Sequence, residues 1–439
     1  MQILKFGGTS VGKPENMHIV AKLITRDAES KIVVLSALSG TTNSLTGIGE
    51  SLREADKEAA KKKIDDLKAH YDNFIPALLR TEAKREEASA VINEHFEFLN
   101  ITLRISYNGA LNRDILAQGE LMSTKLFTLY LQEQGVKARL LPALDFMRTN
   151  EEGEPDIPYT TERLTELIAA HDGVSLFVTQ GYICKNHNGE IDNLKRGGSD
   201  YSASLLGAAL NASEIQIWTD IDGMHNNDPR VVDKTFPIAE LSFDEAAELA
   251  YFGAKILHPA SIWPAQRYGI PVKLLNTMDP EAKGTVIGKD TISNEIKALA
   301  AKDGIIAVKI KSSRMLLAYG FMTKIFQSFE KHKTPVDMVT TSEVAVSVTI
   351  DDDSRLPAIM KELEALGAVE VDRNQTIICV VGNFVAQKKG IVNKIFSAMT
   401  EIPIRMISYG GSRHNISLLI DRADKEEALK RLNSHLFEF

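Results

Sequence analysis

The chain has 439 residues, of which 44% are hydrophobic and 25% charged, the composition of a soluble globular protein. Two or three domains are expected at this length, because single cores rarely grow so large. The net charge of −8, without a basic stripe, excludes an ordinary nucleic-acid-binding surface. Two distant cysteines, Cys184 and Cys379, form no metal or redox pair and indicate a reducing cytosol. With no signal peptide and no apolar run of roughly twenty residues, we expect a cytoplasmic protein without a membrane partner.

The N-terminus begins with a short apolar strand, Met1–Leu4, that leads into a glycine turn, Lys5-Phe6-Gly7-Gly8. Such a turn exposes backbone N–H groups beside a lysine charge and can hold phosphate. Gly7, Gly12 and Lys13 nearly match a P-loop, but Pro14 stands where a P-loop needs a hydroxyl for Mg²⁺. We therefore expect Lys5 to be the phosphate lysine, although a turn of this kind can also be purely structural.

Further apolar strands recur along the chain with helical segments between them. They are expected at residues 31–36, 174–179, 214–219 and 271–275. Nearly continuous apolar character predicts strands buried on both faces of a parallel sheet, hence an α/β fold covered by helices. Residues 45–135 have a helical pattern, with an expected helical insertion at about 45–110. Polar loops follow the strand ends and should converge at one edge of the sheet.

The pattern changes near residue 284, and an internal repeat follows. Residues 320–326 recur as 390–396, and each copy reads as strand, helix, strand, strand, helix. The expected organisation is a catalytic domain at 1–284, a linker at 285–297 and a regulatory region at 298–439. Its two modules are expected at about 315–370 and 385–439. The repeat alone leaves open whether this region is structural, dimerising or a sensor of small molecules.

The central segment, Arg196-Gly197-Gly198-Ser199-Asp200, can be explained in two ways. It can be a tight turn with Ser199 or Asp200 capping the following helix. Alternatively, the planar fork of Arg196 binds a carboxylate at a helix N-terminus, and Asp200 binds an ammonium group or a metal-bound phosphate. Upstream, Gly119 precedes Glu120 inside a helical stretch, where a glycine costs about 1 kcal/mol and indicates close backbone approach.

A polar loop after the expected strand at 214–219 carries Asp220, Asp222 and Arg230. A calcium loop is rejected, because Gly223 comes too early and the closing glutamate is absent. A nucleotide fits this loop better, and Lys255 adds a cation near the same rim. His258, directly before a proline, is expected to pack or cap rather than to catalyse. Together these cations and carboxylates, without a nucleophilic triad or histidine-rich metal set, favour phosphoryl transfer.

Seven motifs together resemble the aspartokinases of the amino-acid kinase superfamily. They are Lys5–Val11, Ser36-Ala37 with Gly40–Asn43, Gly119–Ser123, Arg196–Asp200, Trp218–Asp220, Asp228–Arg230 and Phe252–Pro259. The resemblance covers essentially the whole chain. It implies an amino-acid-kinase-like α/β sandwich with a mostly parallel sheet, followed by two βαββαβ-type ACT modules. It also implies MgATP-dependent phosphorylation of the β-carboxylate of L-aspartate, the first step of lysine, threonine and methionine biosynthesis, by a monofunctional enzyme.

The resemblance also assigns roles to individual residues. Lys5 and Asp200 would be catalytic. The substrate site would comprise Ser36, Thr42, Glu120, Arg196, Gly197, Gly198 and Ser199. The ATP site would comprise Lys5, Phe6, Gly7, Gly8, Thr219, Asp220, His225, Arg230, Lys255 and Ile256. His225 stands where relatives often carry a tyrosine, and the metal ligands are not assigned.

The repeat region resembles that of lysine-sensitive aspartokinases. The effector residues would be Met315, Gly320, Val336, Asp337, Thr341, Ser342 and Glu343, with lysine as the effector. Pro335 and Ala318 depart from the pattern, because sensitive members carry serines there. A homodimer through residues 298–439 is expected. Two alternatives remain: a kinase of another acidic amino acid, and a catalytically silent ACT protein that senses amino acids.

Overall fold

The computed structural model describes the chain except for residues 195–196, 254–256, 290–294, 316–318, 384–388 and 438–439. The chain divides into two compact units. The first comprises Met1–Met224, Ala239–Phe243 and Leu257–Asp290, and the second comprises His225–Ile238, Asp244–Ile256 and Thr291–Phe439. Two segments before residue 284 thus pack with the C-terminal part of the chain, which differs from the expected boundary. Local sequence patterns do not reveal which unit a short loop or helix joins.

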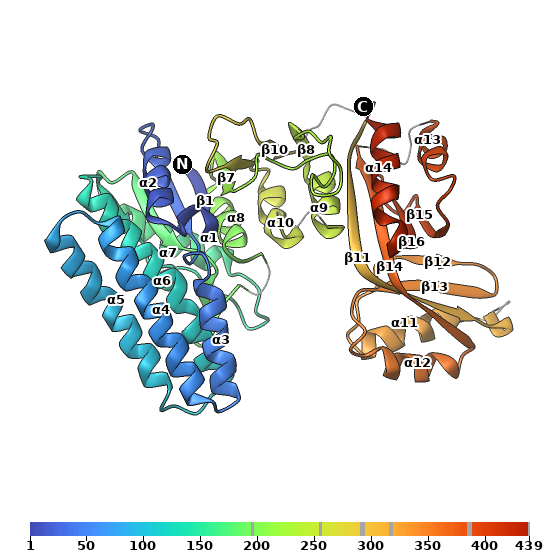
Figure 1. Ribbon diagram of the computed structural model, residues 1–439, viewed down its shortest axis with the longest axis horizontal. Helices are drawn as coiled ribbons and strands as arrows, with labels where there is room; N and C mark the ends of the chain where they lie inside the picture. Colours follow the sequence, from blue (N-terminus) through green and yellow to red (C-terminus); the bar gives the residue numbers. More distant parts are fainter. Residues whose placement is uncertain (195–196, 254–256, 290–294, 316–318, 384–388, 438–439) are drawn as a thin grey trace. The chain divides into compact units, whose positions relative to one another are not determined.

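The first unit is built on an eight-stranded sheet (Figure 1). In sheet order its strands are β3 (Ala138–Leu140), β4 (Leu176–Gln180), β2 (Lys31–Leu35), β1 (Gln2–Phe6), β7 (Glu214–Thr219), β9 (Val272–Asn276), β10 (Thr285–Gly288) and β8 (Glu240–Ser242). All neighbours are parallel except the antiparallel pair β9 and β10. The four strands expected after the first are confirmed, as is the mostly parallel sheet.

Helices cover both faces of this sheet. One layer contains α2 (Pro14–Ile24), α3 (Thr41–Arg53), α4 (Lys57–Leu78), α5 (Glu82–Thr102) and α6 (Gly109–Glu133), of which α3–α6 lie side by side in Figure 1. The other helices of this unit are α1 (Gly8–Val11), α7 (Ile157–Ala169), α8 (Gly198–Leu210) and α10 (Pro259–Tyr268). Asp56 caps α4 and Asn108 caps α6 by accepting backbone N–H bonds. Within the described ranges, no helix has the length and apolarity needed to cross a membrane.

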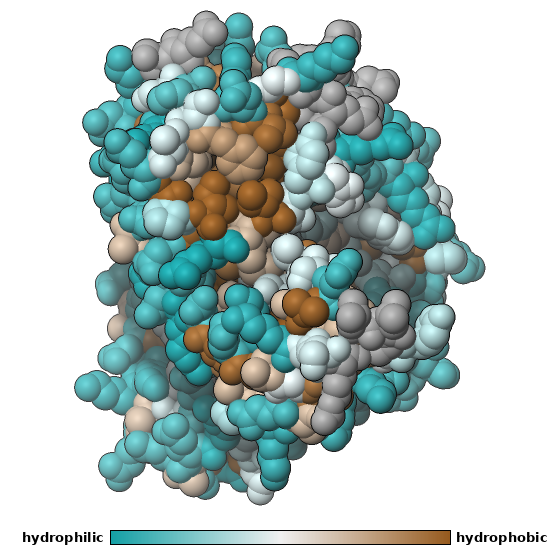
Figure 2. Space-filling view, turned by 90° about the vertical axis from the view of Figure 1, so that its right-hand side faces the viewer, coloured by the Kyte–Doolittle hydropathy of each residue, from teal (hydrophilic) through white to brown (hydrophobic). Residues whose placement is uncertain are grey.

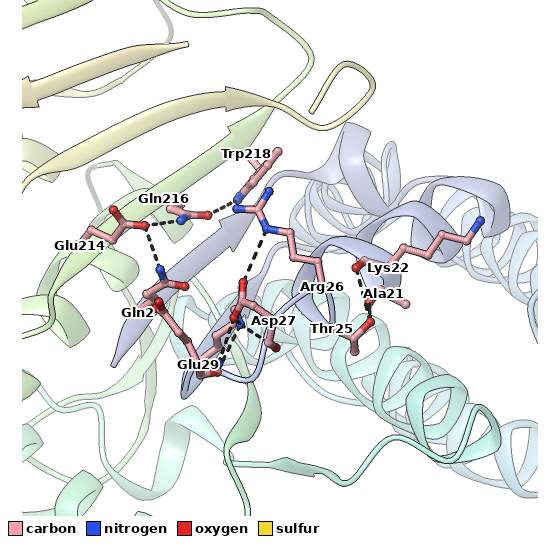
Figure 3. Close-up of polar contacts among 11 residues, drawn as sticks. Gln2, Ala21, Lys22, Thr25, Arg26, Asp27, Glu29, Glu214, Gln216 and Trp218 are labelled. Carbon is pink, nitrogen blue, oxygen red and sulfur yellow. Dashed lines mark hydrogen bonds and ion pairs between the residues drawn. The ribbon is translucent and has the colours of Figure 1, made fainter. Parts of the chain in front are cut away.

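A polar network at the start of β1 and β7 fixes Trp218 (Figure 3). Gln2 donates to Glu214 over 3.1 Å, and Gln216 also donates to that carboxylate. The indole Nε1–H of Trp218 donates to Gln216 Oε1 over 3.0 Å, and the ring stacks on Phe6 with centroids 5.7 Å apart. The ends of the two neighbouring strands are thereby held together just before the loops that carry the candidate site.

The second unit contains an antiparallel six-stranded sheet. Its order is β12 (Val339–Thr341), β13 (Ala345–Ile350), β11 (Ile296–Lys311), β14 (Ala368–Gly382), β16 (Asn415–Asp421) and β15 (Ile404–Tyr409). Its helices are α9 (Phe243–Tyr251), α11 (Phe321–Lys331), α12 (Leu356–Glu364), α13 (Ile391–Ala398) and α14 (Lys425–Leu436). Helices α11 and α12 pack on one hydrophobic core, and α13 and α14 pack on another. The two-module repeat is therefore confirmed.

The two modules share the long strands β11 and β14. The first module begins with the second half of β11 and ends with the first half of β14. The second module begins with the second half of β14. The first half of β11 belongs to the sheet of the second module, because it pairs with residues 377–382. The second module therefore includes residues 296–302, which the expected limits 385–439 omit. The expected linker also begins differently, since Thr285–Gly288 forms β10 of the first sheet.

Candidate active site

The central strand β1 ends with a buried ion pair. Lys5 Nζ lies 2.7 Å from Asp200 Oδ1, and the two side chains are only 12% and 15% exposed. A Cβ added to Gly7 would lie 3.3 Å from the same amine, so the absence of a side chain there leaves space beside it. Strand β1 lies between β2, which follows it in the chain, and β7, which comes much later. Open α/β sheets bind ligands at the carboxyl ends of strands where the strand order reverses in this way.

Two glycines at the start of α8 bring Asp200 to Lys5. Gly197 and Gly198 have φ angles of +75° and +51°, a region in which a residue with a side chain is strained. Gly197 is the N-cap and makes no side-chain cap bond, so the expected capping by Ser199 or Asp200 is wrong. Both residues instead lie in the first turn of the helix. Arg196, the expected partner of the substrate α-carboxylate, lies outside the described residues.

Ser36 and Ser199 join the end of β2 to this helix. Ser36 Oγ donates to Ser199 Oγ over 2.9 Å, and Ser123 Oγ on α6 donates to the carbonyl of Ser36 over 2.9 Å. Gly181, directly after β4, packs so closely that an added Cβ would lie 2.3 Å from Ser199 Cβ. The expected convergence of loops at the ends of β1, β2 and β4 is thus confirmed.

Glu120 is a buried carboxylate at the same edge of the sheet. Its side chain is on α6, and Oε1 accepts the backbone N–H of Ala37 over 3.2 Å. A Cβ on Gly119 would lie 2.7 Å from Ala37 Cβ, which confirms the close approach expected from a glycine within this helix. Burial raises the pKa of Glu120 to about 7, although the Ala37 N–H bond acts in the opposite direction. Such a carboxylate would bind an ammonium group strongly once both are charged.

Tyr182, which follows β4 and Gly181, is a candidate site residue that the sequence analysis missed. Its φ is +66°, and Ile183 N donates to the Gly181 carbonyl over 2.7 Å, so Tyr182 is the central residue of a strained γ-turn. Its own N–H donates to Ser202 Oγ over 2.8 Å. Burial, and then the charge of Glu120, raise the pKa of Tyr182 to about 12. The only sequence signal was a glycine followed by an aromatic residue at a strand end.

Thr42 lies in the first turn of α3, where it is exposed. The preceding Thr41 is buried, and its hydroxyl lies 3.4 Å from the hydroxyl of Tyr71 on α4. Burial raises the pKa of Tyr71 above its usual value, and Glu120 adds to that increase. Helix α4 of the helical insertion therefore packs against the start of α3, while Thr42 is exposed there.

The residues of the first unit that are expected to bind the nucleotide differ in which of their groups could contact it. The Phe6 side chain is fully buried against Trp218, so only its backbone could meet a ligand. Thr219 and Asp220 follow β7, and the Thr219 hydroxyl donates to Asp220 Oδ1 over 3.1 Å. The Thr219 carbonyl accepts Thr277 N–H over 2.8 Å, which fixes this loop to the end of β9. Gly8 begins α1 directly after Gly7.

His225 and Arg230 belong to the second compact unit. His225 Nδ1 lies 2.9 Å from Thr235 Oγ1, and the Arg230 guanidinium donates two bonds to the Asp228 carboxylate at 2.9 and 2.8 Å. The Arg230 side chain is 85% exposed, so it could turn towards a ligand. Lys255 and Ile256 lie outside the described residues. His258 caps α10 by accepting Ala260 N–H, as expected.

The residues of the second unit that are expected to bind the effector differ in burial. Gly320 is the N-cap of α11 with φ +75°, and Met315 and Val336 pack against the core of the first module. Thr341, Ser342 and Glu343 are exposed at the hairpin between β12 and β13. Asp337 has a side chain only 1% exposed, paired with Lys302. Ala318 lies outside the described residues.

Comparisons with known proteins give consistent results. The amino acid kinase family model matches residues 1–276, and an ACT domain model matches residues 378–436. The chain is 36% identical to lysine-sensitive aspartokinase 3 of Escherichia coli over 448 residues, covering 99% of both chains. The crystal structure of E. coli aspartokinase III with aspartate and ADP in the R-state matches with a TM-score of 0.86, 36% identity and complete coverage of both chains. The T-state structure with lysine and aspartate matches with a TM-score of 0.81 and 35% identity, covering 100% of this chain and 99% of the other.

Proposed function

Because the chain belongs to the amino acid kinase family, and within it to the aspartokinases, we propose that it transfers the γ-phosphoryl group of ATP to the β-carboxylate of L-aspartate. The observation that carries this proposal is the ion pair of Lys5 and Asp200 at the end of the central strand, at the same sheet edge as the buried Glu120. A phosphate-binding cation and an ammonium-binding carboxylate are what an amino-acid kinase needs.

The chemistry requires positioning and charge neutralisation more than proton transfer. The β-carboxylate of aspartate has an ordinary pKa near 3.9, so it is already a nucleophile at neutral pH. Lys5 would neutralise charge on the phosphoryl oxygens as they move from ADP to the carboxylate. Glu120 would bind the α-ammonium group and Arg196 the α-carboxylate, which leaves the β-carboxylate directed at the phosphate. Thr42, Ser36 and Ser199 would complete the acceptor site.

Mg²⁺ is expected with ATP, and the residues present can accommodate it. Among the described residues, no cluster of three histidines, cysteines or carboxylates could hold a metal unaided. Mg²⁺ in phosphotransferases commonly uses one or two carboxylates together with phosphate oxygens. Asp200, beside the phosphate lysine, fits that role. When bound, the ion would neutralise phosphate charge alongside Lys5.

The remaining nucleotide contacts are also proposals. Thr219 and Asp220 would contact the nucleoside side, with Gly7 and Gly8 at the phosphates. The resemblance also assigns His225, Arg230, Lys255 and Ile256 to the nucleotide. The exposed guanidinium of Arg230 would have to exchange part of its pairing with Asp228 for a phosphate.

Feedback regulation by lysine through the first ACT module is the proposed role of the second unit. E. coli aspartokinase III, 35% identical to this chain, has been crystallised with lysine and aspartate. The resemblance places the effector at Met315, Gly320, Val336, Asp337 and the 341–343 hairpin. The cytosolic location and the place at the first step of lysine, threonine and methionine synthesis stay predictions.

A homodimer through the ACT modules is proposed for the same region. The face shown in Figure 2 carries an area of hydrophobic side chains surrounded by hydrophilic ones. The outermost strands of the second sheet, β12 and β15, lie close to one another and expose Val339, Ile407 and Tyr409. Strand edges with exposed apolar side chains commonly pair with another chain.

The proposed activity is tested by trapping the acyl phosphate with hydroxylamine during ATP turnover. We expect aspartyl hydroxamate to form with L-aspartate and negligible hydroxamate to form with L-glutamate. Hydroxamate formation with glutamate alone would support a kinase of another acidic amino acid. The absence of product with both substrates, together with lysine binding, would support the silent sensor.

A further inference from the structure

The segment His225–Ile238 of the second unit is a loop closed at its base by a backbone bridge. Next to that bridge, Asn226 N–H donates to the Phe236 carbonyl over 3.0 Å, and Phe236 N–H donates to Asn226 Oδ1 over 2.8 Å. The loop carries His225 and Arg230, which the resemblance to aspartokinases assigns to the nucleotide. We refer to this segment as the nucleotide loop.

Two buried amides of the nucleotide loop donate to one oxygen on α14. Asn226 and Asn227 are buried, and the Nδ2 atom of each lies 3.2 Å from Asn433 Oδ1. Asn433 is itself only 2% exposed, and its Nδ2 donates over 3.1 Å to the Lys234 carbonyl, on the returning arm of the loop. One side chain of α14 therefore binds both arms of the nucleotide loop.

Backbone partners determine which way each of these three amides points. Asn433 Nδ2 faces a carbonyl, which can only accept, and the Oδ1 atoms of Asn226 and Asn227 each accept a backbone N–H. Asn433 Oδ1 is therefore the acceptor that the two loop amides share. Asn227 Nδ2 also reaches the Leu429 carbonyl, but over 3.4 Å. Because a buried donor without an acceptor is costly, the position of the loop depends on Asn433 Oδ1.

Apolar contacts fix the same loop to the second ACT module. Val232 is buried and belongs to the hydrophobic core on which α13 and α14 pack. The Phe236 ring packs edge-to-face on Phe437, with centroids 5.8 Å apart. The Asn226 carbonyl accepts the N–H of Leu299 on β11 over 2.8 Å. Apolar packing has little directionality, so we assign the exact placement of the loop to its hydrogen bonds.

We propose that Asn433 is a positioning residue for ATP, which acts by holding both arms of the nucleotide loop in the arrangement that binds the nucleotide. Asp228, which pairs with the Arg230 guanidinium, directly follows Asn227, so the placement of the asparagine also sets that of the pair. A loop that is ordered before ATP arrives loses less conformational freedom on binding. The inference rests on the proposed ATP-dependent function and adds that α14 contributes to nucleotide affinity.

Two replacements of Asn433 with similar volume should differ in their effect. Asn433→Leu removes the shared acceptor, so ATP should bind about tenfold more weakly, while KM for aspartate should change less than about twofold. Asn433→Asp keeps an acceptor for both loop amides, and in its protonated form it also donates to the Lys234 carbonyl. Its ATP affinity should stay within about threefold of the wild-type value. Ser434→Ala is the matched control, because Ser434 is the next residue of α14 and is exposed.

The test combines calorimetric titration of the full-length protein with MgATP, without aspartate, and hydroxamate assays that give KM for ATP and for aspartate. Weaker ATP binding in Asn433→Leu, beside near-normal binding in Asn433→Asp and Ser434→Ala, supports the proposal. Equal losses in the leucine and aspartate variants would mean that any change at Asn433 disturbs packing, and they overturn it. Unchanged ATP binding in Asn433→Leu also overturns it.

A variant on the loop side decides the question if Asn433→Leu does not fold, which circular dichroism would reveal. Asn227→Asp keeps the acceptor for Asp228 N–H but places a carboxylate oxygen against Asn433 Oδ1. ATP binding weakened about fivefold supports the proposal, and unchanged binding overturns it. Wild-type protein that binds ATP without phosphorylating aspartate contradicts the proposed function and leaves the affinity comparison as the test of positioning. Wild-type protein that does not bind ATP overturns both.

Discussion

Lys5 Nζ lies 2.7 Å from Asp200 Oδ1, and the pair joins the first strand of the chain to a helix almost two hundred residues later. The carboxylate holds the amine at the strand end while the Gly7 backbone leaves space beside it. A cation fixed in this way is ready to neutralise phosphate without reorganisation during transfer. The pair is therefore the structural basis of the proposed catalysis.

Replacing Lys5 with methionine should lower kcat by about 10²–10³, the usual loss when one transition-state charge partner is removed. Steady-state hydroxamate kinetics measure this loss. Lys13→Met is the matched control, because Lys13 is the lysine of the near P-loop spacing and is exposed. Equal losses in the two variants would mean that the near P-loop spacing holds the phosphate after all.

The value of kcat/KM for aspartate should depend on the ionisation of Glu120. Burial raises its pKa to about 7, so the carboxylate that binds the ammonium group forms only as pH rises through that value. We expect kcat/KM to increase from pH 6 to pH 8, and the increase to vanish in Glu120→Gln together with most of the aspartate affinity. A flat wild-type profile would exclude this role.

Glu120→Gln should also make the protein more stable at alkaline pH. The folded-state pKa of about 7 lies above the ordinary 4.5, so the stability contributed by the protonated group is present below pH 4.5 and is lost as pH rises through 7. At pH 8 the neutral amide should therefore add on the order of 3 kcal/mol to the free energy of unfolding. Denaturant unfolding at pH 5 and pH 8 tests this, with Glu97→Gln as the control, because Glu97 on α5 is exposed.

Gly181→Ala should damage the acceptor site through steric displacement. The new Cβ would lie 2.3 Å from Ser199 Cβ and would push the start of α8, and Asp200 with it, away from Lys5. We expect a stability loss of about 1–3 kcal/mol and a kcat loss beyond it. Gly288→Ala, where the same Cβ meets open space, should leave kcat unchanged. Full activity in Gly181→Ala would show that α8 can shift without harm.

The homodimer proposal predicts that a charge on the exposed strand β15 disrupts assembly. Tyr409→Lys should convert a dimeric mass into a monomeric one in sedimentation experiments, because a lysine at a paired strand edge opposes association. Lys331→Ala is a control away from the strands, because Lys331 is an exposed residue at the end of α11. A monomeric wild-type protein would contradict the proposal directly.

The sequence predicts most of the architecture because its signals are local. Continuous apolar runs such as 31–36 predict buried parallel strands, and the recurrence of 320–326 at 390–396 predicts two modules. The sharing of β11 between the modules was not predicted, because residues 296–302 pair with residues 377–382, which lie far along the chain. The membership of α9 in the second unit is equally non-local.

The sequence predicted those residues of the candidate site that are charged or that are glycines at close contacts. Lys5 pairs with Asp200, Glu120 is buried against the backbone of Ala37, and Gly119 allows the predicted close approach to Ala37. Tyr182 was missed because its role depends on a γ-turn, and an aromatic residue at a strand end gives no warning of a positive φ. The occupation of Asp337 by Lys302 was also hidden, since 35 residues separate them.

The central claim is that a β-carboxylate oxygen of aspartate attacks the γ-phosphate of ATP. Aspartate labelled with oxygen-18 in its β-carboxylate, turned over with ATP and hydroxylamine, tests it most directly, because hydroxylamine expels the phosphate with the bridging oxygen. We predict that phosphorus NMR will detect one labelled oxygen in the released phosphate, in step with hydroxamate formation. Release of unlabelled phosphate alone would mean that water attacks ATP and would contradict the account.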